Sequence, residues 1–468
     1  MSSEIHNTDN YREHLANVTQ KGKRIWIYPK IIRGKLYKIR SYLSWFYLAF
    51  FFAGPFIKIN GNPLLLLNVM KRQFVIFGQP FWPQDFLLVV LLLLSLVVFI
   101  VLFTVIYGRV FCGWACPQTI FMEMVFRKIE NLIEGNSVKQ KKLNAMPWNR
   151  EKITKKSLKF VAFFGISFLI ANTFLAYIIG WENLWAKITG PFMEGFPTLI
   201  GLLIFTTVFY LVFAKVRELV CIMICPYGRL QGVMLDPNSM VVAYDDVRGE
   251  PRGKIRKNEN QNEKGDCVDC RLCVDVCPTG IDIRNGTQLE CINCTACIDA
   301  CDSVMEKINK PLGLVRIDSV NNIKNKVGFR FSPRVIAYTV VMVLLMASFG
   351  FLLAKRTDVE AHVFRKRGQT YFQEPNDTIS NMYELGMVNK TFENKTYELK
   401  VTTPGFSVKF VEPKNIIEAN SEVNRLFLIK KHKSDLEKAT SNIEMEIYID
   451  GKFVKKTETT FLAPRKKK

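Results

Sequence analysis

Eight cysteines between residues 267 and 301 constrain this chain more than any other feature. The spacing C-x2-C-x2-C-x3-C occurs twice, at Cys267, Cys270, Cys273 and Cys277, and again at Cys291, Cys294, Cys297 and Cys301. It is typical of bacterial ferredoxins with two 4Fe–4S clusters, in which one tight loop supplies three thiolates and a more distant residue supplies the fourth. Zinc sites and disulfides are the alternatives, but zinc sites usually pair two C-x2-C hooks across a longer spacer. The spacing therefore predicts a small ferredoxin-like domain.

The two cysteine runs are expected to exchange ligands. In two-cluster ferredoxins the fourth cysteine of each run ligates the other cluster. We therefore predict that one cluster, named cluster I, is held by Cys267, Cys270, Cys273 and Cys301. The second, named cluster II, is predicted to be held by Cys291, Cys294, Cys297 and Cys277.

Apolar segments that are long enough to cross a bilayer interrupt the rest of the chain. Phe86–Tyr107 carries no charge, and a helix needs roughly 20 such residues to span a membrane. Burial in a soluble protein is the alternative, which the length and uniformity of this segment exclude. Four further segments are similar, the last of them interrupted by a proline near its end: Leu158–Ile179, Pro197–Ala214, Val335–Ala354 and Ser41–Ile57. The sequence therefore predicts a bundle of five membrane-spanning helices.

Lysine and arginine residues predict how this bundle is oriented. They crowd the segment before the first span and the loop after the second, whereas the loop between the third and fourth spans has only Lys187. Positively charged loops stay in the cytoplasm. The protein is therefore predicted to lie in the inner membrane of a bacterium, with the N-terminus and both clusters on the cytoplasmic side. The net charge is +22, and the lysines and arginines that produce it are expected to contact anionic membrane lipid. These residues flank the spans and do not gather in a nucleic-acid-binding fold, which argues against nucleic acid as a partner.

Four other cysteines form two matching pairs. The motif C-x3-C-P occurs at Cys112 and Cys116 and again at Cys221 and Cys225, each time after an arginine at the cytoplasmic end of a span. Residues four apart share one face of a helix, so both thiols of a pair are expected to point the same way and the two pairs to meet. Four thiolates suit Cu(I), zinc or another iron–sulfur centre, while simple packing in helices is the alternative. Packing is the expected role of the nearby Met122, Met124 and Met223.

Histidine is scarce where a haem would need it. The chain has four histidines, and none lies in a predicted span: His6, His14, His362 and His432. A membrane haem held by two histidines of this chain is therefore excluded. All twelve cysteines fall on the predicted cytoplasmic side, where a reducing compartment keeps thiolates available.

The region after the last span has the pattern of a β-sandwich. Segments such as Ile443–Ile449 alternate apolar and polar residues, and Asp450-Gly451 marks a tight hairpin. Short strands at this spacing favour an immunoglobulin-like domain with a docking role, since no catalytic constellation is visible.

The predicted organisation is a basic tail at 1–40, four spans with both C-x3-C-P motifs at 41–235, a polar linker at 236–266, the two-cluster domain at 267–301, a connector at 302–332, the fifth span at 333–355 and the external sandwich at 369–468.

Taken together, these features resemble the CcoG family of cytochrome c oxidase accessory proteins, also called FixG or RdxA. The resemblance extends from about Tyr28 onward and is most specific at Cys112–Thr119 and Cys221–Gly228. It implies a cupric reductase that converts Cu(II) to Cu(I) for assembly of cbb3-type cytochrome c oxidase. The implied partners are copper ions, oxidase subunits or a copper-transporting ATPase, and an unknown electron donor. The candidate catalytic and copper-facing residues are then Cys112, Cys116, Cys221 and Cys225.

Two other functions remain open at this stage. A quinol-oxidising subunit like NapH shares the paired C-x3-C-P motifs and the two-cluster insert, although the fifth span and the sandwich count against it. The third possibility is an assembly scaffold in which the clusters are structural. Spacing and composition alone indicate a membrane-bound iron–sulfur electron carrier.

Overall fold

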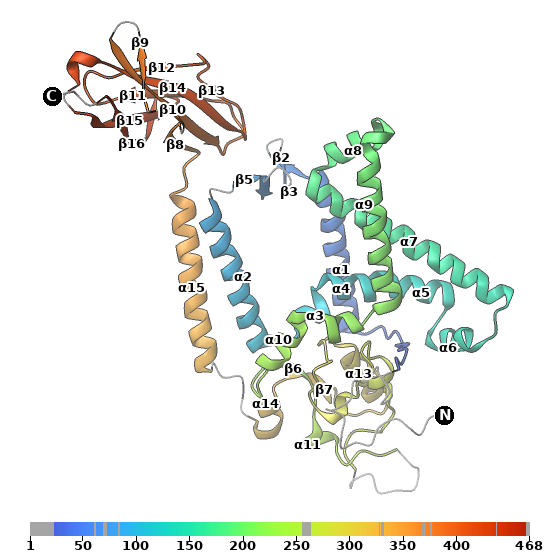
Figure 1. Cartoon of the computed structure of the whole chain (residues 1–468). Coiled ribbons are helices and arrows are strands. Elements are labelled where there is room, and N and C mark those ends of the chain that lie inside the picture. Colours follow the sequence, from blue (N-terminus) through green and yellow to red (C-terminus); the bar gives the residue numbers. More distant parts are fainter. Residues whose placement is uncertain are drawn as a thin grey trace. The chain divides into compact units, whose positions relative to one another are not determined.

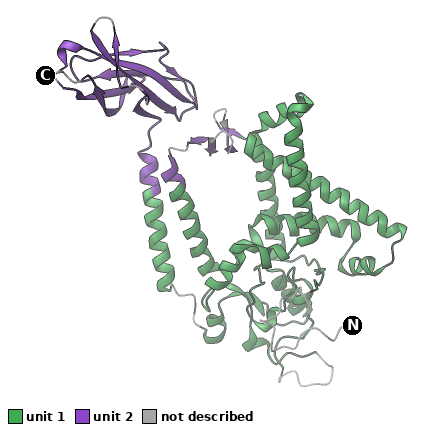
Figure 2. Cartoon of the chain, viewed as in Figure 1, with its two compact units in different colours: residues 1–57, 90–348 green, residues 58–89, 349–468 purple. Residues whose placement is uncertain are grey.

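The structure is a computed structural model with two compact units, formed by residues 1–57 and 90–348 and by residues 58–89 and 349–468 (Figure 2). It describes residues 23–59, 62–68, 73–82, 85–254, 264–326, 328, 332–366, 368, 370–374, 377–436 and 438–464. The longest parts of the predicted organisation outside the described residues are 1–22 of the basic tail and 255–263 of the polar linker.

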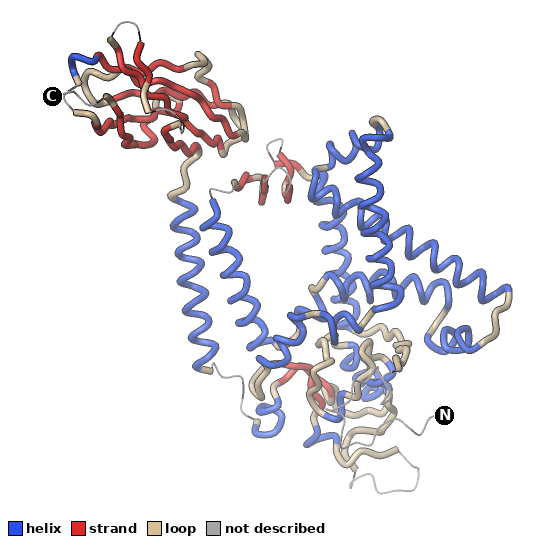
Figure 3. The backbone as a smooth tube through the Cα atoms, in the orientation of Figure 1, coloured by secondary structure: helices blue, strands red, loops and turns tan. Residues whose placement is uncertain are grey.

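Four helices are long and apolar enough to cross a membrane (Figures 1 and 3). They confirm four of the five predicted spans, and the uncharged segment begins and ends at the predicted residues. These helices are α2 (Phe86–Tyr107), α7 (Arg150–Ile179), α9 (Phe192–Leu211, continued as a π-helical turn to Val216) and α15 (Pro333–Ala354).

The fifth predicted span, Ser41–Ile57, is not among these four helices and is not confirmed. It belongs to helix α1 (Lys35–Ala53), which ends at a 3-10 turn containing Pro55. Proline lacks an N–H and clashes with the preceding turn, so it ends the α-helix there. From Ser41 to Ala53 the helix rises only about 20 Å, less than the roughly 30 Å of a bilayer core.

Shorter helices connect the long ones in the first unit. The aromatic core beside them includes Phe126, which stacks on Phe213 with ring centroids 4.8 Å apart. This core joins α1, α7 and α9 to the π-helical segment Ile120–Phe126. The connecting helices are α3 (Val110–Trp114), α4 (Pro117–Thr119), α5 (Arg127–Glu134), α6 (Ser137–Ala145), α8 (Trp181–Thr189) and α10 (Pro226–Met234).

The cysteine-rich domain also lies in the first unit, and its flanks take part in it. Strand β6 (Val241–Tyr244) pairs antiparallel with β7 (Val315–Asp318), which places Val242 opposite Ile317. All four residues of β6 are buried, so part of the segment expected to be a polar linker contributes to the core. The domain's helices are α11 (Asp246–Gly249), α12 (Leu272–Asp275), α13 (Ala296–Lys307) and α14 (Val320–Asn325).

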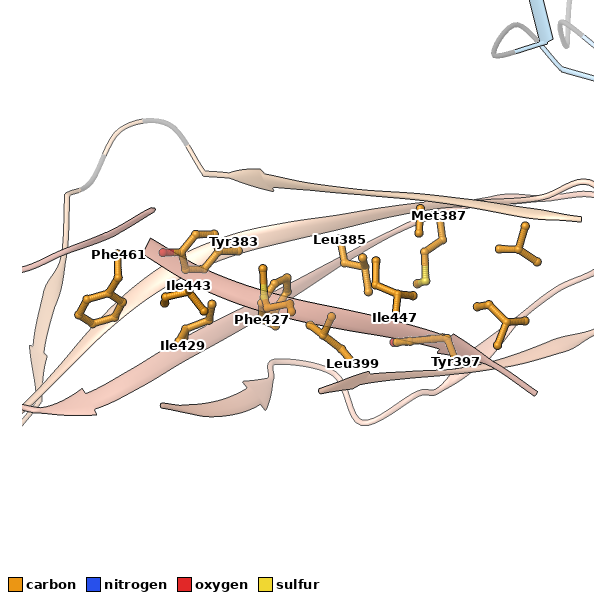
Figure 4. Close-up of a cluster of buried hydrophobic side chains, with 14 of the residues drawn as sticks. Tyr383, Leu385, Met387, Tyr397, Leu399, Phe427, Ile429, Ile443, Ile447 and Phe461 are labelled. Carbon is orange, nitrogen blue, oxygen red and sulfur yellow. The ribbon is translucent and has the colours of Figure 1, made fainter. Parts of the chain in front are cut away.

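The second unit contains the immunoglobulin-like sandwich that the sequence predicts. One sheet has the strand order β12-β14-β10-β8 with β9 added to β10, and the other has the order β13-β11-β15-β16. Apolar side chains from both sheets meet between them (Figure 4). Asp450 and Gly451 have φ of 48° and 76°, as the predicted tight hairpin requires. The strands are β8 (Val359–Arg365), β9 (Phe372–Glu374), β10 (Thr378–Asn389), β11 (Lys395–Val401), β12 (Ser407–Phe410), β13 (Ile416–Ile417), β14 (Glu422–His432), β15 (Thr440–Ile449) and β16 (Lys452–Leu462).

Residues between α1 and α2 form short strands that the sequence did not predict. Here Asp85 accepts from Lys390 at 2.6 Å and from Arg356 at 2.9 Å, and all three side chains are largely buried. This ion-paired group ties the start of α2 to the sandwich within the second unit. The short strands are β1 (Lys58–Ile59), β2 (Asn62–Pro63), β3 (Leu65–Asn68), β4 (Gln73–Ile76) and β5 (Gln79–Phe81).

Candidate functional site

The eight cysteines of the ferredoxin-like spacing surround two cavities. One cavity is lined by Cys267, Cys270, Cys273 and Cys301, the four residues assigned to cluster I. The other is lined by Cys277, Cys291, Cys294 and Cys297, the four residues assigned to cluster II, and Cys273 reaches it as well. The fourth cysteine of each run therefore lies with the first three of the other run. Ligation of the clusters by these residues stays a prediction.

The loops between these cysteines have the same backbone conformation in both runs. Asp269 and Asn293, each two residues after the first cysteine of a run, have φ of 49° and 52°. Arg271 and Thr295, each four residues after it, have φ of 56° and 65°. Left-handed residues that are not glycine are uncommon, so four of them at matching positions identify a repeated structural element. Such turns point successive backbone N–H groups inward and form sites for anions.

The donor set fits two 4Fe–4S clusters, because each cavity offers four thiols among apolar side chains. Burial raises the pKa of Cys273, Cys291 and Cys301 to about 12. Buried thiols lose their protons only when a positively charged metal replaces them, so ligation and proton release are coupled.

The C-x3-C-P motifs do not form one helical face, and this prediction was wrong. Cys112 lies in α3, whereas Cys116 is the extended residue that precedes α4. Cys221 lies in the π-helical turn Val220–Ile224, and Cys225 is again extended before α10. The proline after each second cysteine begins the next helix, and the residue before a proline avoids helical conformation. Each pair therefore spans a break between two helices.

The four thiols of the two motifs nevertheless lie close enough to influence one another. Burial, against the opposing charge of Arg109 and with smaller contributions from Cys116 and Cys225, raises the pKa of Cys112 to about 11. Burial raises the pKa of Cys221 to about 12, with contributions from all three other thiols. In the described part of the chain no three cysteine, histidine or carboxylate groups are arranged as a ready-made metal site. Instead, Cys112 Sγ donates to Gln231 Oε1 at 2.9 Å.

Motif residues also touch the cluster II loop. Cys112 and Cys294 share one small apolar core. A β-carbon on Gly113 would lie 2.5 Å from the carbonyl oxygen of Ile292 and 2.8 Å from the Cα of Cys294. Only glycine permits this approach, so residue 113 brings the first motif directly against the loop that carries Cys294.

Met122 and Met124 are buried, and Met122 packs in the aromatic core of the bundle, in agreement with the expected packing role. Met223 is 48% exposed.

Several contacts around this site have no signal in the sequence. Arg217, which precedes the second motif, is 2% exposed and pairs with Glu130 at 2.7 Å. Gln118, which follows the first motif, donates to the carbonyl oxygen of Arg217 at 3.4 Å. The arginine before each motif was visible as part of the repeat, but its partners are distant in sequence and could not be read from spacing.

Three family models match this chain. A "4Fe-4S dicluster domain" matches residues 216–320, and a "4Fe-4S binding domain" matches residues 89–135, where the cysteines are Cys112 and Cys116. An "IG-like fold at C-terminal of FixG" matches residues 349–464. These matches cover both C-x3-C-P motifs, the two-cluster domain and the sandwich.

Known proteins resemble the chain over most of its length. Protein RdxB of Cereibacter sphaeroides is 32% identical over 397 residues, which cover 81% of this chain and 83% of that protein. Nitrogen fixation protein FixG of Rhizobium meliloti is 32% identical over 421 residues, which cover 81% of this chain and 79% of that protein. The crystal structure of a FixG-related protein from Vibrio parahaemolyticus is 22% identical, covers 23% of this chain and 97% of its own, and has a TM-score of 0.20.

Proposed function

Since this chain belongs to the FixG family of membrane iron–sulfur proteins, also called CcoG or RdxA, we propose that it reduces Cu(II) to Cu(I) at the paired C-x3-C-P thiols. The Cu(I) product serves assembly of the copper site in cbb3-type cytochrome c oxidase. Copper in this proposal is a substrate, and the oxidase subunits or a copper-transporting ATPase are the partners.

The observation that carries this proposal is the contact between the first motif and the cluster II loop. Gly113 brings Cys112 into one apolar core with Cys294, and the second motif contributes two more thiols to the same neighbourhood. When bound, the two 4Fe–4S clusters supply single electrons, which is what the Cu(II)/Cu(I) couple needs. Thiols within contact distance of one cluster loop are well placed for that exchange.

The thiol chemistry favours the reduced ion. Cu(I) prefers thiolate ligands, whereas Cu(II) prefers nitrogen and oxygen in tetragonal geometry. Protonated thiols such as Cys112, held by Gln231, have to release protons before they bind metal.

The proposed orientation has the cysteine-rich domain in the cytoplasm and the sandwich outside. The first turn of α1 contacts α13 through Asp299, and the last turn of α2 contacts the segment before β6, where Met240 N donates to Ile106 O at 2.9 Å. Consecutive helices that leave and return to one domain favour a crossing by α1 as well as by α2. This supports the fifth span despite its short apolar part.

The test is to replace the second cysteine of each motif in the full-length protein. Cys116→Ser and Cys225→Ser should abolish reduction of Cu(II) while both ferredoxin-type clusters stay assembled, because serine oxygen does not stabilise Cu(I). Ala115→Ser is the matched control, since it places the same hydroxyl beside Cys116 without removing a thiol. Full cupric reduction in both cysteine variants would return the four thiols to a packing role.

The same preparation separates the alternatives. If dithionite-reduced protein is reoxidised by a quinone and not by Cu(II), the chain acts like the NapH subunits. If neither acceptor reoxidises it, a scaffold function remains. A content of about twelve irons instead of about eight would indicate that the four C-x3-C-P thiols hold a third cluster, a reading that the family match at residues 89–135 favours.

A further inference from the structure

Two buried arginines beside the cluster II loop have no carboxylate partner among the residues that the structure describes. Arg40 is 5% exposed and Arg109 is 3% exposed. Among the ion pairs of the described residues, neither guanidinium lies within 4.0 Å of an Asp or Glu oxygen. Nη2 of Arg40 and Nε of Arg109 are buried without any hydrogen-bond partner. Burying a charge without a counter-charge costs free energy, so these two side chains indicate that an anion binds nearby.

Both guanidinium groups point at the loop that carries the cluster II cysteines. Arg109 donates to the carbonyl oxygen of Leu289, two residues before Cys291. Arg40 donates to the carbonyl oxygen of Cys294 at 3.5 Å. Carbonyl oxygens satisfy single N–H groups, but they do not neutralise a full positive charge.

Arg109 also reaches the C-x3-C-P motifs. Its guanidinium lies near enough to the thiol of Cys112 to lower the pKa of that thiol, and it passes against Gly228, where a β-carbon would lie 2.8 Å from Nη2. One side chain therefore contacts the first motif, the helix after the second motif and the cluster II loop.

Cluster I has the opposite electrostatic surroundings. Its buried arginine, Arg284, pairs with both Asp269 and Asp282, and Arg271, the other arginine that lines its cavity, is exposed. Asp302 adds a further carboxylate directly after Cys301. The carboxylates near cluster II are engaged elsewhere: Glu123 is paired with Arg127 at 2.9 Å, and Asp299 accepts from the first turn of α1. Glu290 lies beside Cys291 within the influence of Arg109.

We propose that Arg40 and Arg109 are the counter-ions of cluster II and raise its reduction potential above that of cluster I. A 4Fe–4S cluster with four thiolates is an anion whose negative charge grows on reduction, and nearby charge is one of the factors that set its potential. Positive charge in a buried site, where water screens it poorly, stabilises the reduced form. The electron then rests on the cluster whose loop adjoins Cys112. This proposal rests on the two clusters but not on copper.

The experiment is a redox titration of the purified full-length protein, followed by electron paramagnetic resonance of the reduced clusters. Cluster II is identified as the signal that Cys294→Ser alters. In the unchanged protein, cluster II should be reduced at the higher potential. Arg109→Gln and Arg40→Gln should each lower its ratio of reduced to oxidised form at a fixed potential by about tenfold, which corresponds to about 59 mV for one electron.

Control variants separate the charge from the fold. Arg109→Lys and Arg40→Lys keep the charge and should keep most of the potential. Arg229→Gln removes an exposed arginine of α10 and should change neither cluster, because solvent screens it. Iron and sulfide content, measured for each variant, separates loss of a cluster from a shifted potential. If the glutamine variants lose the cluster, two other measurements test the proposal. Cluster II should have the higher potential in the unchanged protein, and the lysine variants should keep most of that potential. A higher potential for cluster I, or a shift confined to cluster I, overturns the proposal.

Discussion

The carboxylate of Asp299 caps helix α1 by accepting the backbone N–H of Tyr37 at 2.7 Å. Its other oxygen accepts from Leu36 N at 3.1 Å, and α1 has no cap of its own at Gly34. The first turn of α1 carries lysines, which the positive end of a helix dipole disfavours. A side chain from α13, the helix that follows Cys294, thus supplies both the hydrogen bonds and the negative charge that α1 lacks.

Removing this cap should loosen the N-terminal segment from the cysteine-rich domain. We expect Asp299→Ala to destabilise the protein by about 1–2 kcal/mol, the usual effect of losing a helix cap. Asp275→Ala is the control, because Asp275 also anchors this segment, through Lys30, but both side chains are 46% exposed and such pairs contribute little. Thermal unfolding and limited proteolysis after Arg33 measure the difference. An equal loss of stability in Asp299→Ala and Asp275→Ala would show that the cap contributes no more than the exposed ion pair.

The glycine contact between the first motif and the cluster II loop should be intolerant of any side chain. Gly113→Ala forces a shift of loop backbone, because the new methyl group would overlap Ile292 O. We expect at least a tenfold slower reduction of Cu(II) with unchanged iron content. Gly201→Ala in α9 is the control, since a β-carbon there meets no atom within 4 Å. Cupric reduction at the unchanged rate in the Gly113 variant would mean that this contact is not the route of the electron.

Crossed ligation makes a prediction about a single cysteine. Cys277→Ser should damage cluster II, although Cys277 belongs to the first run in sequence, because it lines the cavity of the second. Cys301→Ser should damage cluster I in the same way. Iron content should fall from about eight to about four in either variant, with a different remaining resonance signal. The same remaining signal in both variants would contradict the assignment.

The orientation can be read from fusions to alkaline phosphatase, which is active only outside the cytoplasm. A fusion after Lys452 in the sandwich should be active, and one after Lys307 at the end of α13 should be silent. A fusion at Phe77, in the turn between β4 and β5, should be active, because three spanning helices separate it from the cytoplasmic Lys307. The side of the N-terminus tests α1: an N-terminal tag that is protected in intact spheroplasts means that α1 crosses the membrane, whereas a tag that is accessible there means that only four helices do.

The buried pair of Glu130 and Arg217 predicts a pH-dependent stability. Burial alone would raise the pKa of Glu130, but Arg217 and Lys159 lower it to about 2, below the roughly 4.3 of a free glutamate. The ion pairs therefore stabilise the fold fully above about pH 4.3, and this contribution is lost as the pH falls toward 2. Glu130→Gln should destabilise the protein by about 3 kcal/mol at pH 7 and by much less at pH 2. Glu151→Gln, at a fully exposed position, should show no such dependence in unfolding experiments.

The sequence predicted what depends on local pattern. The bounds of α2 follow from its uniform apolar composition, and the tight hairpin at Asp450 follows from turn chemistry. The helical reading of the C-x3-C-P motifs failed because it used the spacing of four and ignored the proline that begins the next helix. Residues such as Arg109 and Asp299 act through partners more than 150 positions away, and no periodicity reports such a pair. The cysteine thiols of the site could therefore be predicted from the sequence, whereas the charged side chains that surround them could not.

The left-handed residues of the cysteine loops have a consequence for assembly. Thr295 is β-branched and 1% exposed, and Arg271 is bulky, so neither adopts a positive φ without an energetic penalty of about 1–3 kcal/mol. The predicted iron–thiolate bonds would compensate for that penalty, which their loss would release. A protein stripped of iron should therefore relax at these loops, beginning at Thr295. Cluster insertion would then be a late folding step, and it would set the final conformation of the cluster II loop that the first motif contacts.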